Sequence, residues 1–132
     1  MKQFNLEIAA PDGVVFSGAA ESLLIKCEEG DVEILAGHTD YFAVVGIGRA
    51  RIKADGASRI GSVSGGMLSV SNGEVKVAVH SFEYSDEIDV GRAKAAKEKA
   101  EEMIKNATDD KALAAAKIRL LKAINRINVA EL

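Results

Sequence analysis

The sequence predicts a β-sandwich of eight to ten short antiparallel strands, followed by an antiparallel hairpin of two α-helices. Before residue 87, apolar and polar residues alternate in short runs between closely spaced turn signals, which is typical of antiparallel strands with one buried face. Eleven of the twelve glycines, the single proline and all six aromatic residues lie in this part of the chain. After it, apolar residues recur at intervals of three and four, which is typical of helices.

We expect the β-sandwich to occupy residues 1–84, with its turns at short glycine-containing segments. In order along the chain, these segments are residues 11–13, 28–31, 55–56 and 72–73. Asn72 and Gly73 lie between two alternating runs and suit the positive φ angles of a type I′ turn, so they predict the clearest hairpin. Gly65 and Gly66 are interpreted as backbone geometry before a hairpin strand. They do not form a phosphate loop, because no Lys-Ser/Thr pair follows them.

The helical hairpin is expected over residues 87–132. Asp86 can cap its first helix, with Glu87 and Asp89 in the first turn, where negative charge is favourable. Residues 106–110, Asn-Ala-Thr-Asp-Asp, predict a break with a new cap. The apolar stripes expected to join the two helices consist of Ala93, Ala96, Ala100, Ile104 and Ala107 in the first, and Leu113, Ala116, Leu120, Ile124 and Ile127 in the second.

The second helix carries more apolar surface than a two-helix contact uses. Ala114, Ile118 and Leu121 fall on a face that adjoins its stripe. Residues 111–130 also hold five basic residues and no acidic one: Lys111, Lys117, Arg119, Lys122 and Arg126. Two interpretations stay open with even weight. Either the apolar arc packs on the chain's own sandwich while the basic side chains are solvated, or it docks on an acidic, partly apolar partner.

Composition limits the classes of function. The chain has 132 residues, of which 48% are hydrophobic and 28% charged, enough for one domain or two small units. Its apolar runs are shorter than the roughly 18 residues of a membrane helix and it begins without a signal-peptide core, so we expect a cytoplasmic or peripheral protein. A formal net charge of -3 does not suggest a nucleic-acid partner. Cys27, His38 and His80 are its only cysteine and histidines, so neither a disulfide nor a metal site is expected.

Four segments, in their order along the chain, carry a family resemblance. They are Pro11–Gly13, Glu33–His38, Val63–Gly66 and Ile88–Ala96. Over its whole length the chain resembles the epsilon subunit of bacterial F-type ATP synthase. The resemblance implies a non-catalytic rotor subunit of the central stalk that links the gamma subunit to the c-ring and supports proton-coupled ATP synthesis. It also implies a mobile hairpin that inhibits ATP hydrolysis when it extends toward the beta and alpha subunits, and a peripheral position at the cytoplasmic face of the cell membrane.

The resemblance further implies a regulatory ATP site, with no cofactor required. The motif Ile88-Asp89-x-x-Arg92-Ala93 is present, while Lys99 and Lys122 stand where ATP-binding relatives carry arginine. The implied ATP-binding set is Glu83, Ile88, Asp89, Arg92, Ala93, Lys99, Lys122 and Arg126. The alternative interpretation is structural, with Asp89 placed as a helix acid and Arg92 paired with it.

Other residues receive smaller roles. The resemblance implies an inhibitory contact with beta through Lys117, Arg119, Lys122 and Arg126. His38 is either structural or part of a c-ring contact, and Cys27 is expected to be buried. Catalytic residues are not expected, because the sequence has no nucleophile with a base and no spaced carboxylate pair. The alternative function, from another class, is a free-standing ATP-sensing module.

Overall fold

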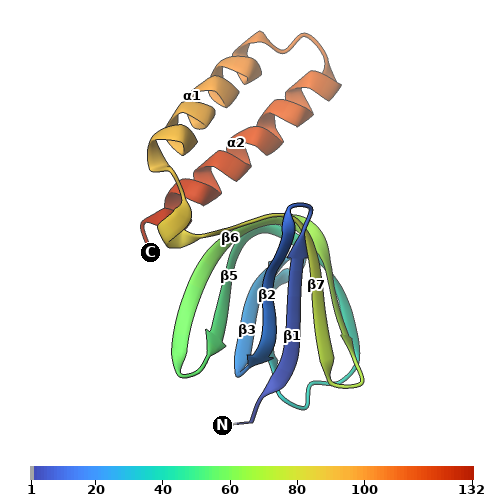
Figure 1. Ribbon diagram of the computed structural model, residues 1–132. Coiled ribbons are helices and arrows are strands. Elements are labelled where there is room, and N and C mark those ends of the chain that lie inside the picture. The colour runs from blue at the N-terminus through green and yellow to red at the C-terminus, as the bar shows by residue number, and fades with distance from the viewer. Residues whose placement is uncertain (1) are drawn as a thin grey trace. The chain divides into compact units, whose positions relative to one another are not determined.

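The first part of the chain forms a single seven-stranded sheet and the second part a pair of helices (Figure 1). The computed structural model describes residues 2–132, and the chain divides into two compact units, the first ending at Tyr84 and the second spanning Ser85–Leu132. The strands are β1 (Phe4–Ala10), β2 (Gly13–Ala20), β3 (Ser22–Cys27), β4 (Gly30–Leu35), β5 (Tyr41–Ala54), β6 (Ala57–Ser71) and β7 (Glu74–Tyr84). The predicted fold class, β-structure followed by a two-helix hairpin, is confirmed.

The strand order is β2-β1-β7-β6-β5-β3-β4, and every neighbouring pair is antiparallel except β1 with β7, which is parallel. The prediction of eight to ten short antiparallel strands was therefore wrong in number, in length and in this one pairing. β5, β6 and β7 have 14, 15 and 11 residues. Gly65 and Gly66, which were expected to precede a hairpin strand, lie inside β6 and bend it without ending it.

Along each long strand, burial shifts from one set of alternate residues to the other. In β6, Val63 is buried before the glycine pair and Leu68 and Val70 are buried after it, so the alternation shifts by one residue. Side chains alternate strictly along a regular strand, so such a shift lets both halves of a bent strand face one core. Gly66 adopts a φ of 138°, and a Cβ there would collide with the carbonyl oxygen of Ala78. Glycine is therefore required at the bend.

β5 and β7 follow the same rule as β6. In β5, Val45 is buried on one side of two glycines, and Ala50 is buried on the other side in the opposite phase. In β7, buried Val79 is followed by half-buried Phe82 and Tyr84, again in the opposite phase. One hydrophobic core results, which includes Phe4, Leu6, Ile8, Leu23, Ile25, Ile34, Val45, Ile52, Val63, Leu68, Val75 and Val77.

The tight turns agree with their sequence signals. Asn72 and Gly73 have φ angles of 51° and 79°, so the predicted type I′ turn between β6 and β7 is confirmed. Asp55 and Gly56, with φ angles of 52° and 75°, join β5 to β6 in the same way. The carboxylate of buried Glu21 accepts a hydrogen bond from the Gly56 amide at 3.0 Å, which fixes this second turn to the start of β3.

The second unit contains a short 3-10 helix η1 (Ser85–Glu87) and the helices α1 (Val90–Asn106) and α2 (Asp110–Ala130). The predicted break between the helices is confirmed, and Asp109 caps α2 through a 2.7 Å bond from the Ala112 amide. The prediction that Asp86 caps α1 was wrong. Asp86 lies in η1, and the cap is Asp89, which accepts a hydrogen bond from the Arg92 amide at 3.0 Å. The chain needs one turn of η1 before α1 can begin.

Alanines dominate the contact between α1 and α2. Ala93, Ala100, Ala116 and Ala123 are all buried where the helices pack. Ala96, which was predicted to belong to this stripe, is exposed. It lies about 60° around the helix from Ala93. Because the side chains in the contact are small, the buried strip is narrow and does not include Ala96.

The bend in β6 generates a stability prediction. Replacing Gly66 with alanine should lower the free energy of unfolding by about 2–4 kcal/mol, because the new Cβ meets backbone and the residue must keep a positive φ. Gly46→Ala is a matched control inside β5, where a Cβ would meet its nearest atom at an ordinary 3.6 Å. Urea unfolding of both variants measures the difference, and equal losses of stability would contradict the assigned role of Gly66.

Candidate functional site

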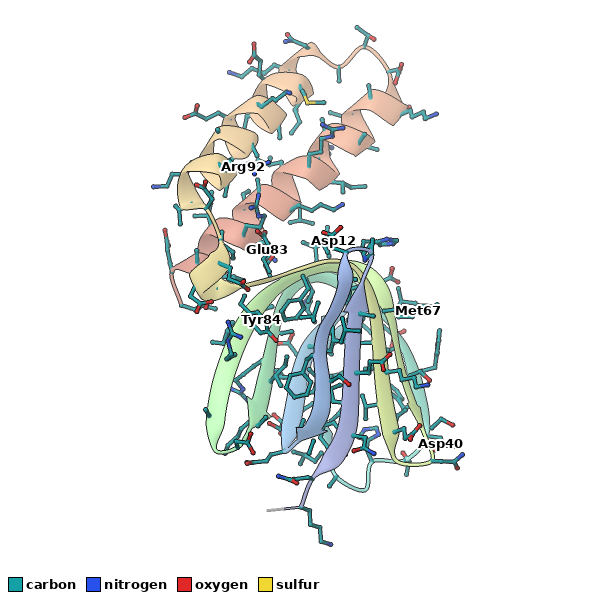
Figure 2. All side chains as sticks on the ribbon, in the orientation of Figure 1. Asp12, Asp40, Met67, Glu83, Tyr84 and Arg92 are labelled. Atoms are coloured by element: carbon teal, nitrogen blue, oxygen red, sulfur yellow. The ribbon has the colours of Figure 1, made fainter. Side chains whose placement is uncertain are left out.

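The start of α1 holds the first group of predicted site residues. Asp89 and Arg92 are exposed, while Ile88 and Ala93 are buried. The Asp89 carboxylate accepts its hydrogen bond from the Arg92 backbone amide. Between residues 2 and 132 no ion pair joins the side chains of Asp89 and Arg92. Helix capping therefore accounts for one oxygen of Asp89, and Arg92 is positioned as an exposed cation in the first turn of α1 (Figure 2).

The remaining basic residues of the predicted ATP set lie on both helices. On α1, Lys99 follows Arg92 by two turns on the same face, about 10 Å along the axis. On α2, Lys122 and Arg126 share a face because they are four residues apart. The connection at residues 107–109 makes the helices antiparallel, and the end of α2 contacts η1. Arg126 therefore lies at the same end of the hairpin as Arg92.

Glu83 belongs to the other unit. It is half-buried near the end of β7, where it lies opposite Ser62 of β6 in the sheet register (Figure 2). The hairpin thus places Asp89, Arg92 and Arg126 at one end of the helical unit. Glu83 is placed by the sandwich.

The outward surface of α2 has two kinds of residue. Ala114, Ile118 and Leu121 form an exposed apolar strip, in which Ile118 is 49% and Leu121 53% exposed. Arg119, Lys122 and Arg126, spaced by three and four residues, share one flank of this strip. Lys117 lies about 140° around the helix from Lys122, on the opposite flank. The four basic residues predicted to contact beta therefore do not form a single face, because the apolar strip separates Lys117 from the others.

Sequence reasoning missed an apolar face on the outside of the sheet. Val44 of β5, Met67 of β6, Ala78 of β7 and Ala9 of β1 are direct neighbours in register across four strands. Val44 is 43% exposed and Met67 52%, and Phe42, two residues before Val44, is 61% exposed. We call these five residues the apolar face (Met67 is labelled in Figure 2).

A sequence signal for the apolar face did exist. Val44-Val45 and Met67-Leu68 are adjacent apolar pairs inside strands. Successive side chains in a strand point to opposite faces, so one member of each pair has to lie on the outside of the sheet. Val45 and Leu68 are the buried members, which leaves Val44 and Met67 for the surface.

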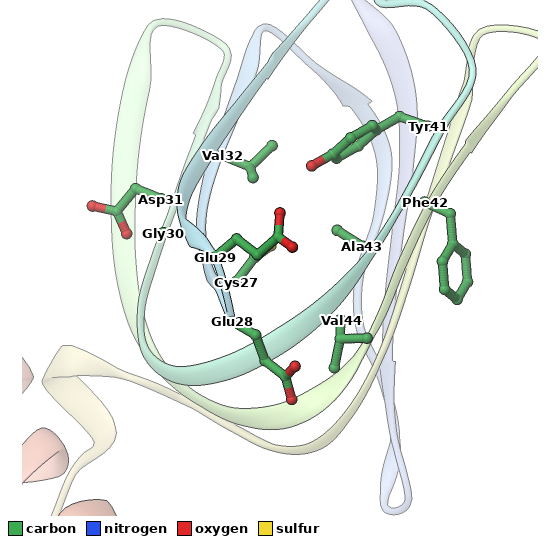
Figure 3. Close-up of a pocket in the computed structure, with 10 residues that line it drawn as sticks. All are labelled: Cys27, Glu28, Glu29, Gly30, Asp31, Val32, Tyr41, Phe42, Ala43 and Val44. Carbon is green, nitrogen blue, oxygen red and sulfur yellow. The ribbon is translucent and has the colours of Figure 1, made fainter.

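A pocket of about 420 Å³ opens between the β3–β4 turn and the start of β5 (Figure 3). It is lined by Cys27, Glu28, Glu29, Gly30, Asp31, Val32, Tyr41, Phe42, Ala43 and Val44. Burial raises the pKa of the Cys27 thiol and the Asp31 carboxylate raises it further, so this thiol stays protonated at neutral pH. The prediction that Cys27 is buried is confirmed.

His38 stands next to this pocket. Its ring lies 5.6 Å from the ring of Tyr41, tilted by 60°. Its Nδ1 atom is 2.7 Å from the carbonyl oxygen of Thr39, which accepts a hydrogen bond from it. These two contacts position the imidazole at the Gly37-His38 loop, beside Tyr41, which lines the pocket.

The described part of the chain holds neither a metal-binding cluster nor a membrane-spanning helix. Among residues 2–132, no group of three or more histidine, cysteine, aspartate or glutamate side chains could hold a metal ion. No helix formed by these residues combines the length and the apolar character needed to span a membrane.

Comparison with known proteins covers nearly the whole chain. The family model of the ATP synthase delta/epsilon chain β-sandwich domain matches residues 3–85, and the model of the long α-helix domain of that chain matches residues 86–131. The ATP synthase epsilon chain of Bacillus pumilus (strain SAFR-032) is 38% identical over 130 residues, which are 98% of each chain. The ATP synthase epsilon chain of Ruminococcus albus is 38% identical over 131 residues, again 98% of each chain.

Solved structures show the same fold. A chain in the cryo-EM structure of the Euglena gracilis mitochondrial ATP synthase, OSCP/F1/c-ring in rotational state 1, aligns with a TM-score of 0.84 at 21% identity. The alignment covers 98% of this chain and 82% of that one. A chain of the Tetrahymena thermophila mitochondrial ATP synthase central stalk and c-ring aligns with a TM-score of 0.65 at 14% identity, covering 98% and 97%.

Proposed function

This chain belongs to the delta/epsilon chain family of ATP synthase and is a non-catalytic epsilon subunit of the central stalk, and we propose that its sandwich links the gamma subunit to the c-ring while its hairpin regulates ATP hydrolysis. The observation that carries the proposal is the apolar face on the sandwich. Val44, Met67 and Ala78 are exposed and lie side by side across three strands. Exposed apolar residues gathered in one place mark interaction surfaces.

We assign the apolar face to gamma for a physical reason. A permanent contact with another subunit excludes water best where side chains are apolar and the backbone is rigid. The apolar face meets both conditions, since its residues lie in paired strands and not in loops. In a free-standing ATP-sensing module, the alternative function, no partner would cover this surface and it would stay exposed to water.

We assign the c-ring contact to His38 and to the acidic turn between β3 and β4. Glu28, Glu29 and Asp31 lie in or next to the β3–β4 turn beside the pocket. Three carboxylates and an imidazole suit contacts with the polar, basic loops of a partner. An epsilon subunit seated on the c-ring in this way would be a peripheral protein at the cytoplasmic face of the cell membrane.

The alanine contact between α1 and α2 supports a mobile hairpin. Alanine buries little apolar area, and larger residues of the same face, such as Leu113 and Leu120, are only half-buried, so the helix pair is held together by a modest free energy. The exposed strip of Ile118 and Leu121 gives α2 a second apolar surface for an alternative partner. Two competing contacts of similar strength are what a two-state element needs. In the extended state, α2 would place this strip and its basic flanks against the beta and alpha subunits.

ATP is proposed as a regulatory ligand of the folded hairpin, with no cofactor required. Arg92 and Arg126 lie at the same end of the hairpin and can supply planar donors for phosphate. Lys99 and Lys122 keep the positive charge of the arginines found in ATP-binding relatives but lose the bidentate fork. Ile88 and Ala93, both buried, would act by shaping the start of α1.

The gamma contact can be tested with one charged substitution. Met67→Glu should weaken binding to gamma by on the order of tenfold or more, because it places a carboxylate in the centre of the apolar face. Val14→Glu is the matched control, since Val14 is 63% exposed on β2 and outside that face. Affinity for purified gamma is measured by titration calorimetry, with circular dichroism to confirm folding. Equal affinity of both variants for gamma would contradict the assignment of the gamma contact to the apolar face.

Two substitutions at one position separate capping from ATP binding. Asp89→Ser keeps an N-cap side chain, so it should preserve stability, whereas Asp89→Ala should lose about 1 kcal/mol of it. Both remove the carboxylate, so both should lower ATP affinity if Asp89 contacts the nucleotide. Nucleotide titration and thermal unfolding of the two variants give the result. Wild-type ATP affinity in Asp89→Ser would leave Asp89 with the capping role alone.

The basic residues of α2 are expected to strengthen inhibition. Replacing Lys117, Arg119, Lys122 and Arg126 together with alanine should raise ATP hydrolysis by the assembled enzyme, because each exposed pair contributes roughly 0.2–1 kcal/mol. Since Lys117 lies on the opposite flank of the apolar strip, Arg119→Ala and Lys117→Ala should change ATP hydrolysis by different amounts. Arg126→Ala alone should lower hydrolysis if its main role is to hold ATP in the folded form. Unchanged hydrolysis in the fourfold variant at low salt, with the subunit bound, would rule out an electrostatic role for α2.

A further inference from the structure

The two units are joined without a linker. Tyr84 is the last residue of β7, and Ser85 is the first residue of η1. η1 contacts α2, so it is part of the helical unit. Domain boundaries usually fall in flexible segments of several residues. Here a strand and a helical turn meet at the Tyr84–Ser85 peptide.

Contacts of the Tyr84 side chain hold the end of β7 in place. The guanidinium carbon of Arg59, from β6, lies 3.5 Å from the centroid of the Tyr84 ring. The ring of Phe82 meets that of Tyr84 edge-on, with centroids 4.9 Å apart and planes at 72°. The Tyr84 hydroxyl donates a hydrogen bond to the carbonyl oxygen of Val15, in β2, at 3.3 Å. We call Arg59, Phe82, Tyr84 and the Val15 carbonyl the Tyr84 clamp (Tyr84 is labelled in Figure 2).

The backbone of β6 is adapted to this clamp. Gly61 lies opposite Tyr84 in the sheet register. A Cβ on Gly61 would come within 2.6 Å of the Phe82 ring and 2.9 Å of the Glu83 carbonyl oxygen. The missing side chain therefore makes the room in which Phe82 lies against β6 and supports the Tyr84 ring.

We propose that the Tyr84 clamp fixes the pivot of the hairpin at Ser85 and so sets the balance between its folded and extended forms. This inference rests on the proposed regulatory function. Strand ends open locally unless they are tied down, and the last three residues of β7 would otherwise join the tether to the hairpin. A longer tether lowers the effective concentration of the hairpin at its folded position. Loosening the clamp therefore favours the extended, inhibitory form.

Hydrogen exchange of the full chain tests the first step. Arg59→Gln removes the cation above the ring, and exchange at the amides of residues 82–84 should become about two- to fivefold faster, with the rest of the sheet unchanged. Arg51→Gln is the matched control, since Arg51 pairs with Glu33 at 3.7 Å, away from the clamp. Tyr84→Phe keeps the rings and loses only the bond to Val15, so its effect should be smaller. Unchanged exchange at residues 82–84, or faster exchange across the whole sheet, would overturn the proposal.

ATP hydrolysis by the assembled enzyme tests the second step. Because Arg59→Gln loosens the clamp and adds about three residues to the tether, this variant should show about twofold less ATP hydrolysis. Arg51→Gln leaves the clamp intact and should keep the wild-type rate. Faster exchange at residues 82–84 with wild-type hydrolysis would show that the clamp does not set the balance. The fourfold substitution in α2 serves as the reference for the regulatory function itself. If that variant and Arg59→Gln both leave hydrolysis unchanged, the regulatory function fails, whereas a response of the fourfold variant alone defeats only the clamp.

Discussion

Strict alternation of side chains along a β-strand is the constraint on which this structure depends. A strand of 14 or 15 residues can serve one small core only if it bends and its buried phase shifts by one residue. Glycine makes this possible, most clearly at Gly66, where there is no room for a Cβ beside the backbone of β7. The bend in turn decides which apolar residues remain outside, so Val44 and Met67 become a surface while Val45 and Leu68 fill the core.

The helical unit follows a different principle. Its two helices touch through alanines, which allow close approach but bury little apolar area. Larger apolar side chains, Ile118 and Leu121, face away from that contact. Large residues also line the α2 face that holds Ala116 and Ala123, where they are half-buried: Leu113, Leu120, Ile124 and Ile127. The additional exposed strip with Ile118 and Leu121 is consistent with a part whose second contact lies on another subunit, while the sandwich, with its single continuous core, provides a fixed body.

Local chemistry determined which features could be predicted. The Asn72-Gly73 turn and the helix break before Asp109 were predicted because positive φ angles and N-caps depend on neighbouring residues alone. Asp86 was mistaken for the cap because several acidic residues precede α1, and their assignment depends on whether a turn of η1 intervenes. The bend at Gly66 could not be predicted by the same reasoning, since it depends on which strands pair. The pairs Val44-Val45 and Met67-Leu68 did signal exposed apolar residues, but that Val44 and Met67 are neighbours on one face depends on the register between β5 and β6. The ATP, beta and c-ring residues stay predictions that came from the family resemblance.

The cap at Asp89 also bears on how the hairpin could hold a nucleotide. The first turn of a helix is an attractive place for phosphate when its amide groups are unoccupied. In α1, the Asp89 carboxylate already bonds the Arg92 amide and brings its own negative charge to that end. Phosphates would therefore be repelled from the helix terminus and held by side chains, with Arg92 and Arg126 as the nearest planar donors. Asp89 also sets where α1 begins. A ligand that bonded to its carboxylate would therefore alter the first turn of α1, which is the turn that positions Arg92.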